Sequence, residues 1–386
     1  MRGVGRNRGT GMAEELKPSG IGGQAVMEGV MMRNRTKYAV AVRKSDGEMI
    51  LNVRESHSIT EKLPFLGWPF LRGAVSLVES LIVGMGTLMY SANFADEEPP
   101  KKDAPADSET ADAASENVAP VTAAASADAK KPEVLMTPAV IGATVALSLI
   151  VTIALFIFLP FAVTSLLERV TGIDSPLFSS LTEGVIRIAI FIGYVALISR
   201  MNEIQRVFRY HGAEHKTINC IEHGLPLTVE NARVSSKEHK RCGTSFMIFV
   251  MVISILIFSV VNMFPLYTGT SRILKFLVRF GVRLLLLPIV AGISYEFLRL
   301  AGRSNNRFVN ALSRPGMWMQ ALTTKEPDDT MLAAAIASVE AVFDWKAFLA
   351  GTPAESCATG TESGEYRIEA DGSYTAIETG FLAKSK

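Results

Sequence analysis

The chain of 386 residues has few cysteines, few charges and no nucleotide-binding fingerprint. Three cysteines are too few for a disulfide scaffold, and they suit a reducing compartment. Charged residues make up 20% of the chain and the net charge is +1, so the basic excess of a general nucleic-acid binder is missing and we expect no nucleic-acid partner. Neither a GxGxxG pattern nor a P-loop occurs, so the sequence gives no sign of a nucleotide site.

Hydrophobic residues, 48% of the chain, are concentrated in long runs. Two of the runs carry no charge and match the length of a helix that crosses about 30 Å of hydrocarbon. A third is short by itself, but its helix can continue through Tyr210, and the fourth contains Pro288, which predicts a kink. We therefore predict a mainly α-helical membrane protein with about four transmembrane helices within residues 138–300. The four runs are residues 139–159, 184–199, 246–264 and 276–298.

Residues 73–94 form a further apolar stretch, with Glu79 inside it and glycines that weaken an isolated helix. Lysine and arginine are concentrated in residues 1–72, 200–244 and 299–325, which hold twelve, eight and five of them. Cytoplasmic segments carry such an excess, and four spans place all three segments inside only if residues 73–94 do not cross. We therefore predict an interfacial or re-entrant helix there, with both termini in the cytoplasm and the protein in the cytoplasmic (inner) membrane.

The segments outside the spans differ in composition. Strand-like runs on either side of the turn residues Asp46 and Gly47 predict a small antiparallel β meander, in a cytoplasmic domain of residues 19–72. An apolar periodicity after Pro327 predicts an amphipathic helix in a cytoplasmic segment of residues 301–350. We expect a disordered basic arm at residues 1–18, a disordered acidic Ala/Pro linker at residues 95–133, and a mostly disordered tail at residues 351–386, where only residues 366–377 resemble a hairpin.

Four of the five histidines and two of the three cysteines fall within residues 200–244, which we predict to be a polar loop between the second and third spans. If the second span continues as a helix, His211 and His215 lie on one face at i and i+4, where two imidazoles can chelate one metal ion. His239 and Cys242 precede the third span, and the N-terminus of that helix favours a thiolate at Cys242. The sequence therefore predicts a site for a divalent transition metal, with zinc as the expected metal and these four residues as ligands.

Glu214 comes directly before His215, where its carboxylate could reach a metal-bound water rather than the metal. The segment from His211 to His215 matches the H-x-x-E-H pattern of one class of metalloprotease, and Glu214 is then the candidate catalytic base. Gly212 is a weakness of this interpretation, because glycine loosens a helix. Two other interpretations stay open: four protein ligands also describe a closed structural zinc site, and Cys242 could be a small buried apolar residue.

Three other acidic residues are candidates for function. Glu28 follows a glycine pair that could admit a ligand, although a packed strand start explains the same residues. Glu79 and Glu296 lie in apolar segments, where acids are functional candidates by default. Pairing with Arg72 or Arg299 near the interface is the alternative explanation for both.

Several segments together resemble one protein family: IGGQAVMEGVMMR, RGAVSLVESLIVG, YHGAEHKTINC, HKRCGTSF and LTTKEPDD. They are similar to the YqhQ-like family of bacterial multi-pass membrane proteins, which have no established function and are described as predicted metal-dependent enzymes. The resemblance covers about residues 18–345, apart from the expected linker. It implies a multi-pass membrane protein and favours a metal site, but it implies no reaction and no substrate.

The sequence thus predicts an integral membrane protein that binds a metal and acts as a metal-dependent hydrolase at the cytoplasmic face. Zinc would be held by His211 and His215, with His239, Cys242 or both, and one of the four would lie outside the coordination sphere because catalysis needs an open position. Whether the chain is an enzyme stays open. The alternative is a non-enzymatic scaffold or transport-accessory protein, with a structural zinc site and a membrane-protein partner. The lipid bilayer is expected to surround the spans in either case.

Overall fold

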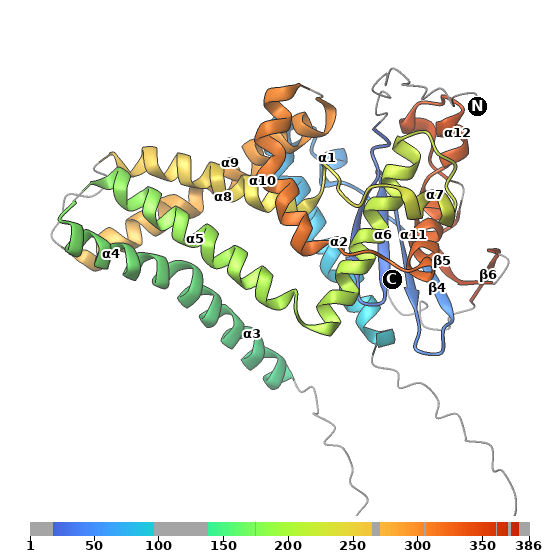
Figure 1. The fold of residues 1–386 in the computed structure, drawn as a ribbon, viewed down its shortest axis with the longest axis horizontal. Helices are drawn as coiled ribbons and strands as arrows, with labels where there is room; N and C mark the ends of the chain where they lie inside the picture. The colour runs from blue at the N-terminus through green and yellow to red at the C-terminus, as the bar shows by residue number, and fades with distance from the viewer. Residues whose placement is uncertain are drawn as a thin grey trace, which may run out of the picture.

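The computed structural model describes residues 18–95, 138–173, 175–264, 271–304, 306–359, 361–369 and 372–377. It consists of a β-sheet packed between helices and of long apolar helices that extend from one side of the sheet (Figure 1). The expected basic arm, apart from its last residue, and the expected linker, apart from its first, lie outside the described residues.

Six antiparallel strands form one sheet, in the order β1 to β6. The predicted N-terminal meander is confirmed as its first four strands, with Ala39 of β3 aligned with Met32 of β2 and with Val53 of β4. The strands are β1 (Gly22–Val26), β2 (Gly29–Asn34), β3 (Lys37–Arg43), β4 (Met49–Glu55), β5 (Gly364–Ile368) and β6 (Tyr374–Ala376).

The last two strands come from the C-terminal segment, which we expected to be mostly disordered. The structure differs: β5 pairs with the edge strand β4, aligning Tyr366 with Leu51, and β6 then pairs with β5. An edge strand presents unpaired N–H and C=O groups that favour pairing with another segment. The partner of β4 lies some 300 residues away in sequence, so local composition does not reveal it.

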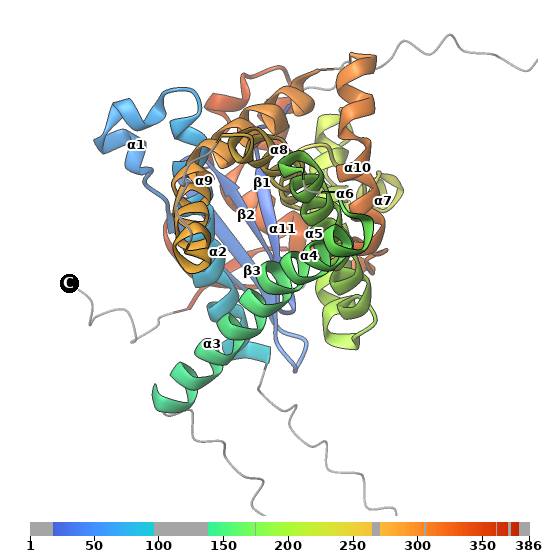
Figure 2. The same cartoon turned by 90° about the vertical axis from the view of Figure 1, so that its left-hand side faces the viewer.

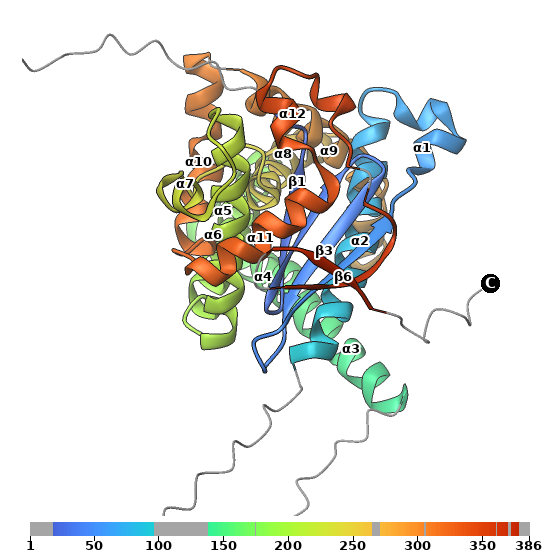
Figure 3. The ribbon, with the colours of Figure 1, turned by 90° about the vertical axis from the view of Figure 1, so that its right-hand side faces the viewer.

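Helices cover both faces of the sheet. One face packs against α6 (Asn202–Glu222) and α11 (Asp329–Val342), and Figure 3 shows α11 in front of the strands. The other face packs against α2 (Leu71–Ala95), whose residues Val83 and Leu88 contact a small apolar cluster on the strands. A sheet buried on both faces needs apolar residues on both, which explains why its strands do not alternate strictly between apolar and polar residues.

The helix predicted after Pro327 is present as α11. It begins at Asp329, and the carboxylate of Asp328 accepts a hydrogen bond from the N–H of Met331 at 3.0 Å, which caps the helix. Most of the side chains of α11 are buried, and not only those on one apolar face, because α11 lies between the sheet and α6.

The remaining elements are α10, which spans Arg307–Thr323, and five short ones. The short elements are α1 (Ile59–Lys62), η1 (Pro64–Gly67), α7 (Val229–Val234), α12 (Trp345–Leu349) and η3 (Ala354–Ser356).

Five helical segments of the described chain are long and apolar enough to cross a membrane, which makes this a multi-pass membrane protein. Four of them extend away from the sheet and correspond to the four predicted spans. The first consists of three consecutive elements, which are α3 (Pro138–Ile153), the π-helix η2 (Ala154–Phe158) and α4 (Leu159–Thr171). The other three are α5 (Pro176–Ile198), α8 (Gly243–Asn262) and α9 (Arg272–Arg303).

The fifth segment is α2, the helix that we predict to be interfacial or re-entrant. Its N-terminal half packs closely on α9, since a Cβ at Gly73 would lie 2.7 Å from the Cβ of Tyr295. Its C-terminal half packs on the sheet. In Figure 1, α2 runs across the direction of α8 and α9. This packing favours the prediction that α2 does not cross, and the number of crossings stays a prediction.

The second span does not continue as one helix through Tyr210, contrary to our expectation. α5 ends at Ile198 and α6 begins at Asn202, and Met201 between them is extended, with φ −72° and ψ 135°. The break lets α6 leave the direction of the span and pack on β1 and α11. The histidines therefore lie on a separate helix that belongs to the sheet-containing part.

A charged cluster inside the spans was not anticipated from the sequence. Glu183 and Arg187 of α5 lie 3.7 Å apart, and Arg283 of α9 lies 3.0 Å from the same Glu183 oxygen. The Nε of Arg187 also donates to the carbonyl of Phe156, in the π-helix, at 3.0 Å. Charges within a bilayer are costly unless they are paired. Glu183 therefore balances part of the charge of two arginines and links α5 to α9.

Replacing Glu183 by Gln should destabilise the folded protein by about 3 kcal/mol, because it leaves two arginines in an apolar environment without their carboxylate. The thermal unfolding midpoint of purified protein in detergent measures the change. The matched control is Glu203→Gln, the same substitution at an exposed position in the first turn of α6. Equal midpoints for both variants would mean that the cluster does not stabilise the helix bundle.

Candidate metal centre

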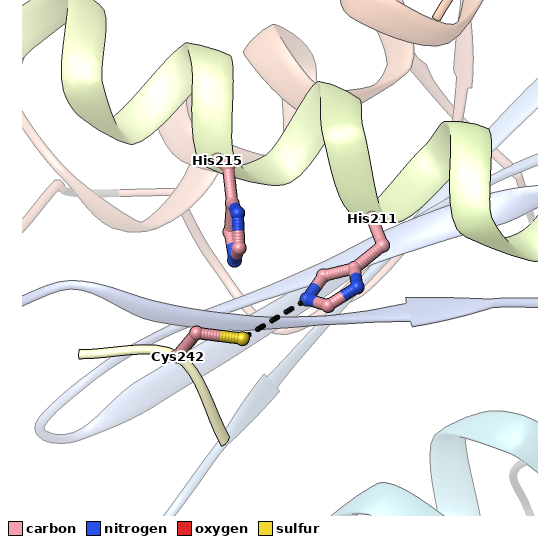
Figure 4. Close-up of side chains that lie close together, drawn as sticks. All are labelled: His211, His215 and Cys242. Atoms are coloured by element: carbon pink, nitrogen blue, oxygen red, sulfur yellow. Dashed lines mark hydrogen bonds between the residues drawn. The ribbon is translucent and has the colours of Figure 1, made fainter. Parts of the chain in front are cut away.

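The two predicted chelating histidines lie on α6, which is a buried helix and not the polar loop we expected. Tyr210 and all residues from 212 to 222 are buried, because this part of α6 lies between β1, α7 and α11. His211 and His215 are separated by one helical turn and point to the same side (Figure 4).

His211, His215 and Cys242 come together at one point. One ligand atom from each of the three lies within 4.8 Å of the others. The Nε2 of His211 is 3.2 Å from the Sγ of Cys242, which is the contact drawn in Figure 4. Two imidazoles and one thiol are ligands that zinc and related transition metals prefer.

Backbone carbonyls hold both imidazoles in place. The Nδ1 of His211 is 2.8 Å from the carbonyl of Thr323, and the Nδ1 of His215 is 2.6 Å from the carbonyl of Lys237. Each Nδ1 donates to its carbonyl, because a carbonyl oxygen can only accept, and each Nε2 is directed into the site. Metal-binding histidines are typically oriented by such a second hydrogen bond.

The environment of the His215 Nε2 is the feature of the site that best fits a metal ion. It is buried and has no hydrogen-bond partner among the described residues. A buried polar atom without a partner is costly, so native proteins rarely leave one. The Nε2 of His215, the Nε2 of His211 and the Sγ of Cys242 therefore form a donor set that a transition metal would satisfy.

Cys242 lies at the N-terminus of α8 and caps it. Its Sγ accepts a hydrogen bond from the N–H of Thr244 at 3.4 Å and is 3.1 Å from the hydroxyl of the same residue. These contacts fix the position of the Sγ beside the two imidazoles.

His239, the fourth predicted ligand, lies beside this group rather than within it. Its ring is 5.6 Å from that of His215, centroid to centroid, and its Nε2 is 3.5 Å from a carboxylate oxygen of Glu222. Gln320 holds its backbone in place, with the side-chain oxygen accepting from the N–H of His239 at 2.9 Å and the amide donating to its carbonyl at 2.8 Å. Three residues rather than four thus surround the candidate metal position.

Glu222 is buried and carries several hydrogen bonds. Its carboxylate accepts from the N–H and hydroxyl of Ser19, both at 2.7 Å, and from Arg241. Burial raises the pKa of Glu222, but the hydrogen bond from His239 and the charge of Arg241 outweigh burial and bring the pKa down to about 2. Burial also lowers the pKa of His239, to about 4, so this histidine is neutral at physiological pH.

Acid should destabilise the protein through Glu222. Because its folded pKa lies below the ordinary value of 4.5, its contribution is fully present above pH 4.5 and is lost as the pH falls toward 2. The shift corresponds to about 3 kcal/mol. Thermal midpoints of wild type and Glu222→Gln between pH 7 and pH 3 measure the effect, and the fall with pH should be smaller in the variant. Parallel curves would contradict this role for Glu222.

Glu214, the candidate base, lies on the side of α6 that faces β1. A Cβ on Gly23 would be 2.7 Å from the Cγ of Glu214, so the strand can approach the carboxylate only because residue 23 is glycine. Burial raises the pKa of Glu214 to about 7, although the charge of His211 and a hydrogen bond from the N–H of Gly23 lower it. The carboxylate is thus enclosed one turn from His211 on the same helix.

Gly212 has a packing role that the sequence did not indicate. A Cβ at this position would overlap the backbone carbonyl oxygen of Lys325, whose own N–H donates to the carbonyl of Phe208 at 2.9 Å. The glycine therefore lets the end of α10, which carries the carbonyl of Thr323, and the residues after it lie against His211.

Gly212→Ala should destabilise the protein by about 3 kcal/mol, because the overlap is with backbone that cannot rotate away. The control is Gly193→Ala in α5, where a Cβ would meet nothing within 4 Å and helix propensity favours alanine. Thermal midpoints of the two variants should move in opposite directions. Tolerance of Gly212→Ala would mean that α6 and this segment are not in close contact.

The other acidic candidates form ion pairs elsewhere. Glu28 pairs with Arg206, an exposed residue in the first half of α6. Glu296 accepts two hydrogen bonds from Arg72, each 2.6 Å long. Glu79 accepts from the hydroxyl of Ser58 and the N–H of Ile59, both at 2.7 Å, and lies 3.5 Å from Arg33. The pairing of Glu296 with Arg72 is the one named as its alternative explanation, whereas Glu79 lies next to Arg33 rather than Arg72 or Arg299.

Comparisons with known proteins identify a family but give no reaction. The family described as "Protein of unknown function (DUF1385)" matches residues 68–345. The chain is 32% identical to the "Uncharacterized protein YqhQ" of Bacillus subtilis (strain 168) over 339 residues, which cover 85% of this chain and 93% of that protein. No solved structure matches the chain.

Proposed function

The chain belongs to the DUF1385 family, the YqhQ-like family that its motifs resemble. We propose that it is a zinc-binding membrane protein that acts as a hydrolase. The observation that carries the proposal is that the buried Nε2 of His215 has no hydrogen-bond partner among the described residues and lies close to the Nε2 of His211 and the Sγ of Cys242. Three protein ligands leave a fourth position, as in catalytic zinc sites.

The residues around the site support hydrolysis. When bound, zinc supplies Lewis-acid activation of a water molecule at neutral pH. Glu214 would accept a proton from the attacking water, for which a pKa near 7 is well matched. The carbonyls of Thr323 and Lys237 keep both imidazoles in the metal-binding tautomer. Gly23 keeps the carboxylate of Glu214 enclosed.

We place the centre at the cytoplasmic face of the inner membrane, with both termini in the cytoplasm. The lysine and arginine distribution supports this orientation, since the segments that carry the site and the sheet are the basic ones. The thiol ligand also fits a reducing compartment, where free cysteines persist.

A structural zinc site is the second candidate, and the burial of the ligands favours it. His215 and Cys242 are both buried, and they come from α6 and from the start of α8. A metal held there would fix the sheet-containing part to a membrane span. In that case the protein is a scaffold or transport-accessory protein with a partner in the membrane, and Glu214 is not needed for its function.

Metal analysis of protein purified without chelator tests the proposal, and we expect close to one zinc per chain. Removal of the metal then separates the two candidates. For a catalytic site we expect loss of hydrolytic activity, measured on a panel of chromogenic esters and phosphodiesters, with the fold retained. For a structural site we expect loss of the folded state, measured by circular dichroism. Protein without bound transition metal would overturn both.

A further inference from the structure

Two separate segments expose large aromatic side chains near the spans. In the segment of residues 59–71, Phe65, Trp68 and Phe70 are 51%, 66% and 54% exposed. This segment consists of α1, η1 and the turn into α2, and Ile59 and Leu63 are exposed as well. So many apolar groups in one short segment are unfavourable in water, and a patch of this kind marks an interaction surface.

The second segment is α10. Phe308 and Trp318, which are 74% and 71% exposed, lie about 80° apart around the helix axis, and Leu312, one turn after Phe308, is 48% exposed. The exposed basic residues Arg307 and Arg314 share the side of Trp318. The C-terminal half of α10 is held against α8 and the loop before it through Gly316 and Gln320. Exposed aromatic and basic residues on a helix beside the spans are typical of a helix that lies in a membrane interface.

Both segments are located at the end of the spans that meets the sheet. The carbonyl of Phe70 lies against Gly292 of α9, and Gly316 of α10 lies against Ser245 of α8. The rings of Phe249 and Phe297 contact each other at 4.7 Å, which aligns α8 with α9. Ser245 lies four residues from Phe249 toward the sheet, and Gly292 lies five residues from Phe297 in the opposite direction. At 1.5 Å per residue, the contacts at Ser245 and Gly292 are therefore roughly 14 Å apart along the helix axes.

Ser245 directly precedes the apolar run of residues 246–264, and Gly292 lies six residues, about 9 Å, inside the end of the run of residues 276–298. The two contacts therefore lie on either side of the edge of the hydrocarbon. The view along the spans in Figure 2 shows α1 on one side of the helix group and α10 on the other. Tryptophan and basic residues are enriched at this level of membrane proteins, since an aromatic ring with a polar group is stable between lipid tails and water.

We infer that Phe65, Trp68 and Phe70 together with Phe308, Leu312 and Trp318 form an aromatic collar that inserts into the headgroup–acyl boundary of the bilayer. The partner is the lipid surface itself, on the leaflet next to the sheet. The collar fixes the sheet and α6 against the membrane from two sides. The inference does not depend on a bound metal.

The three tryptophans of the chain allow a direct test. Trp68 and Trp318 belong to the collar, whereas Trp345 lies in α12 on the sheet-containing part and donates to Glu340 at 3.0 Å. Replacing two of the three by Phe gives full-length variants with a single tryptophan, and Trp345 is the matched control. Each variant is reconstituted in phosphatidylcholine–phosphatidylglycerol vesicles that carry doxyl spin labels at different depths.

We expect emission from Trp68 and Trp318 to be shifted to shorter wavelength and to be quenched most strongly by labels on the headgroup or on upper acyl carbons. Emission from Trp345 should be unaffected. Quenching of Trp68 and Trp318 no stronger than that of Trp345 would overturn the inference, and it would mean that water or a second copy of the chain covers the segments. Strongest quenching by labels at the bilayer centre would also overturn it.

Discussion

His215→Ala should reduce the zinc content of the purified protein from close to one per chain to almost none. His215 contributes a buried Nε2 without another partner among the described residues, and only two ligands would remain. Changes to groups outside the coordination sphere weaken metal binding by 10- to 100-fold, so we expect the loss of a direct ligand to exceed about 100-fold. Metal content by mass spectrometry and competition with a chromogenic chelator measure both quantities.

The control for this variant is His223→Ala. His223 is the C-terminal cap of the same helix, is exposed, and its Nδ1 contacts the carbonyl of Asn219 at 2.7 Å. The same substitution there should leave the zinc content unchanged. If His215→Ala retains its zinc, or if both variants lose it equally, His215 is not a ligand and the three-residue centre is wrong.

Glu214→Gln should keep the zinc and lose hydrolytic activity by about 100-fold or more, which is the usual contribution of a general base. The substitution preserves the shape of the side chain beside Gly23 and removes only the proton-accepting oxygen. Metal content and the rate on the substrate that the wild-type protein hydrolyses are measured on the same preparation.

The outcome for Glu214→Gln distinguishes three roles of this residue. Lost activity with retained zinc agrees with the base. Lost zinc would make Glu214 a ligand. Equal rates in wild type and variant, with zinc in both, would show that Glu214 takes no part in the chemistry and would favour the structural site. Glu230→Gln, at an exposed position in the first turn of α7, serves as the control for the substitution itself.

The sequence was sufficient to predict the parts of the site that depend on local spacing. His211 and His215 are four residues apart, so any helix brings them to one side, whether or not it continues from the span. Cys242 lies four residues before a long apolar run, so its place at a helix N-terminus followed from the start of that run. The meander was predicted from two strand-like runs around one turn.

Features that depend on distant segments were not predicted. Nothing near His239 in the sequence indicates that Gln320 holds its backbone, or that Glu222 occupies its Nε2. Similarly, Gly23 and Glu214 are almost 200 residues apart, and the contact between them depends on the packing of β1 on α6. The charged cluster at Glu183 depends on which faces of the spans meet, and apolar runs alone do not specify this.

The break between α5 and α6 had no clear signal either. Residues 199–210 are compatible with a continuous helix, and the chain bends at Met201 because α6 packs on the sheet instead of entering the direction of the span. Tertiary packing thus overrode local helix preference at this point. The consequence is that the predicted polar loop is part of a buried core, which accounts for the low exposure of the candidate ligands.

X-ray absorption at the zinc edge of the purified, membrane-solubilised protein tests the central proposal most directly. A centre formed by His211, His215 and Cys242 predicts one sulfur ligand at about 2.3 Å, two imidazoles at about 2.0–2.1 Å and one further oxygen ligand. The spectrum should not change in His239→Ala, because His239 faces Glu222. A spectrum without sulfur, or one in which a third imidazole replaces the oxygen and disappears in His239→Ala, would contradict the three-residue centre.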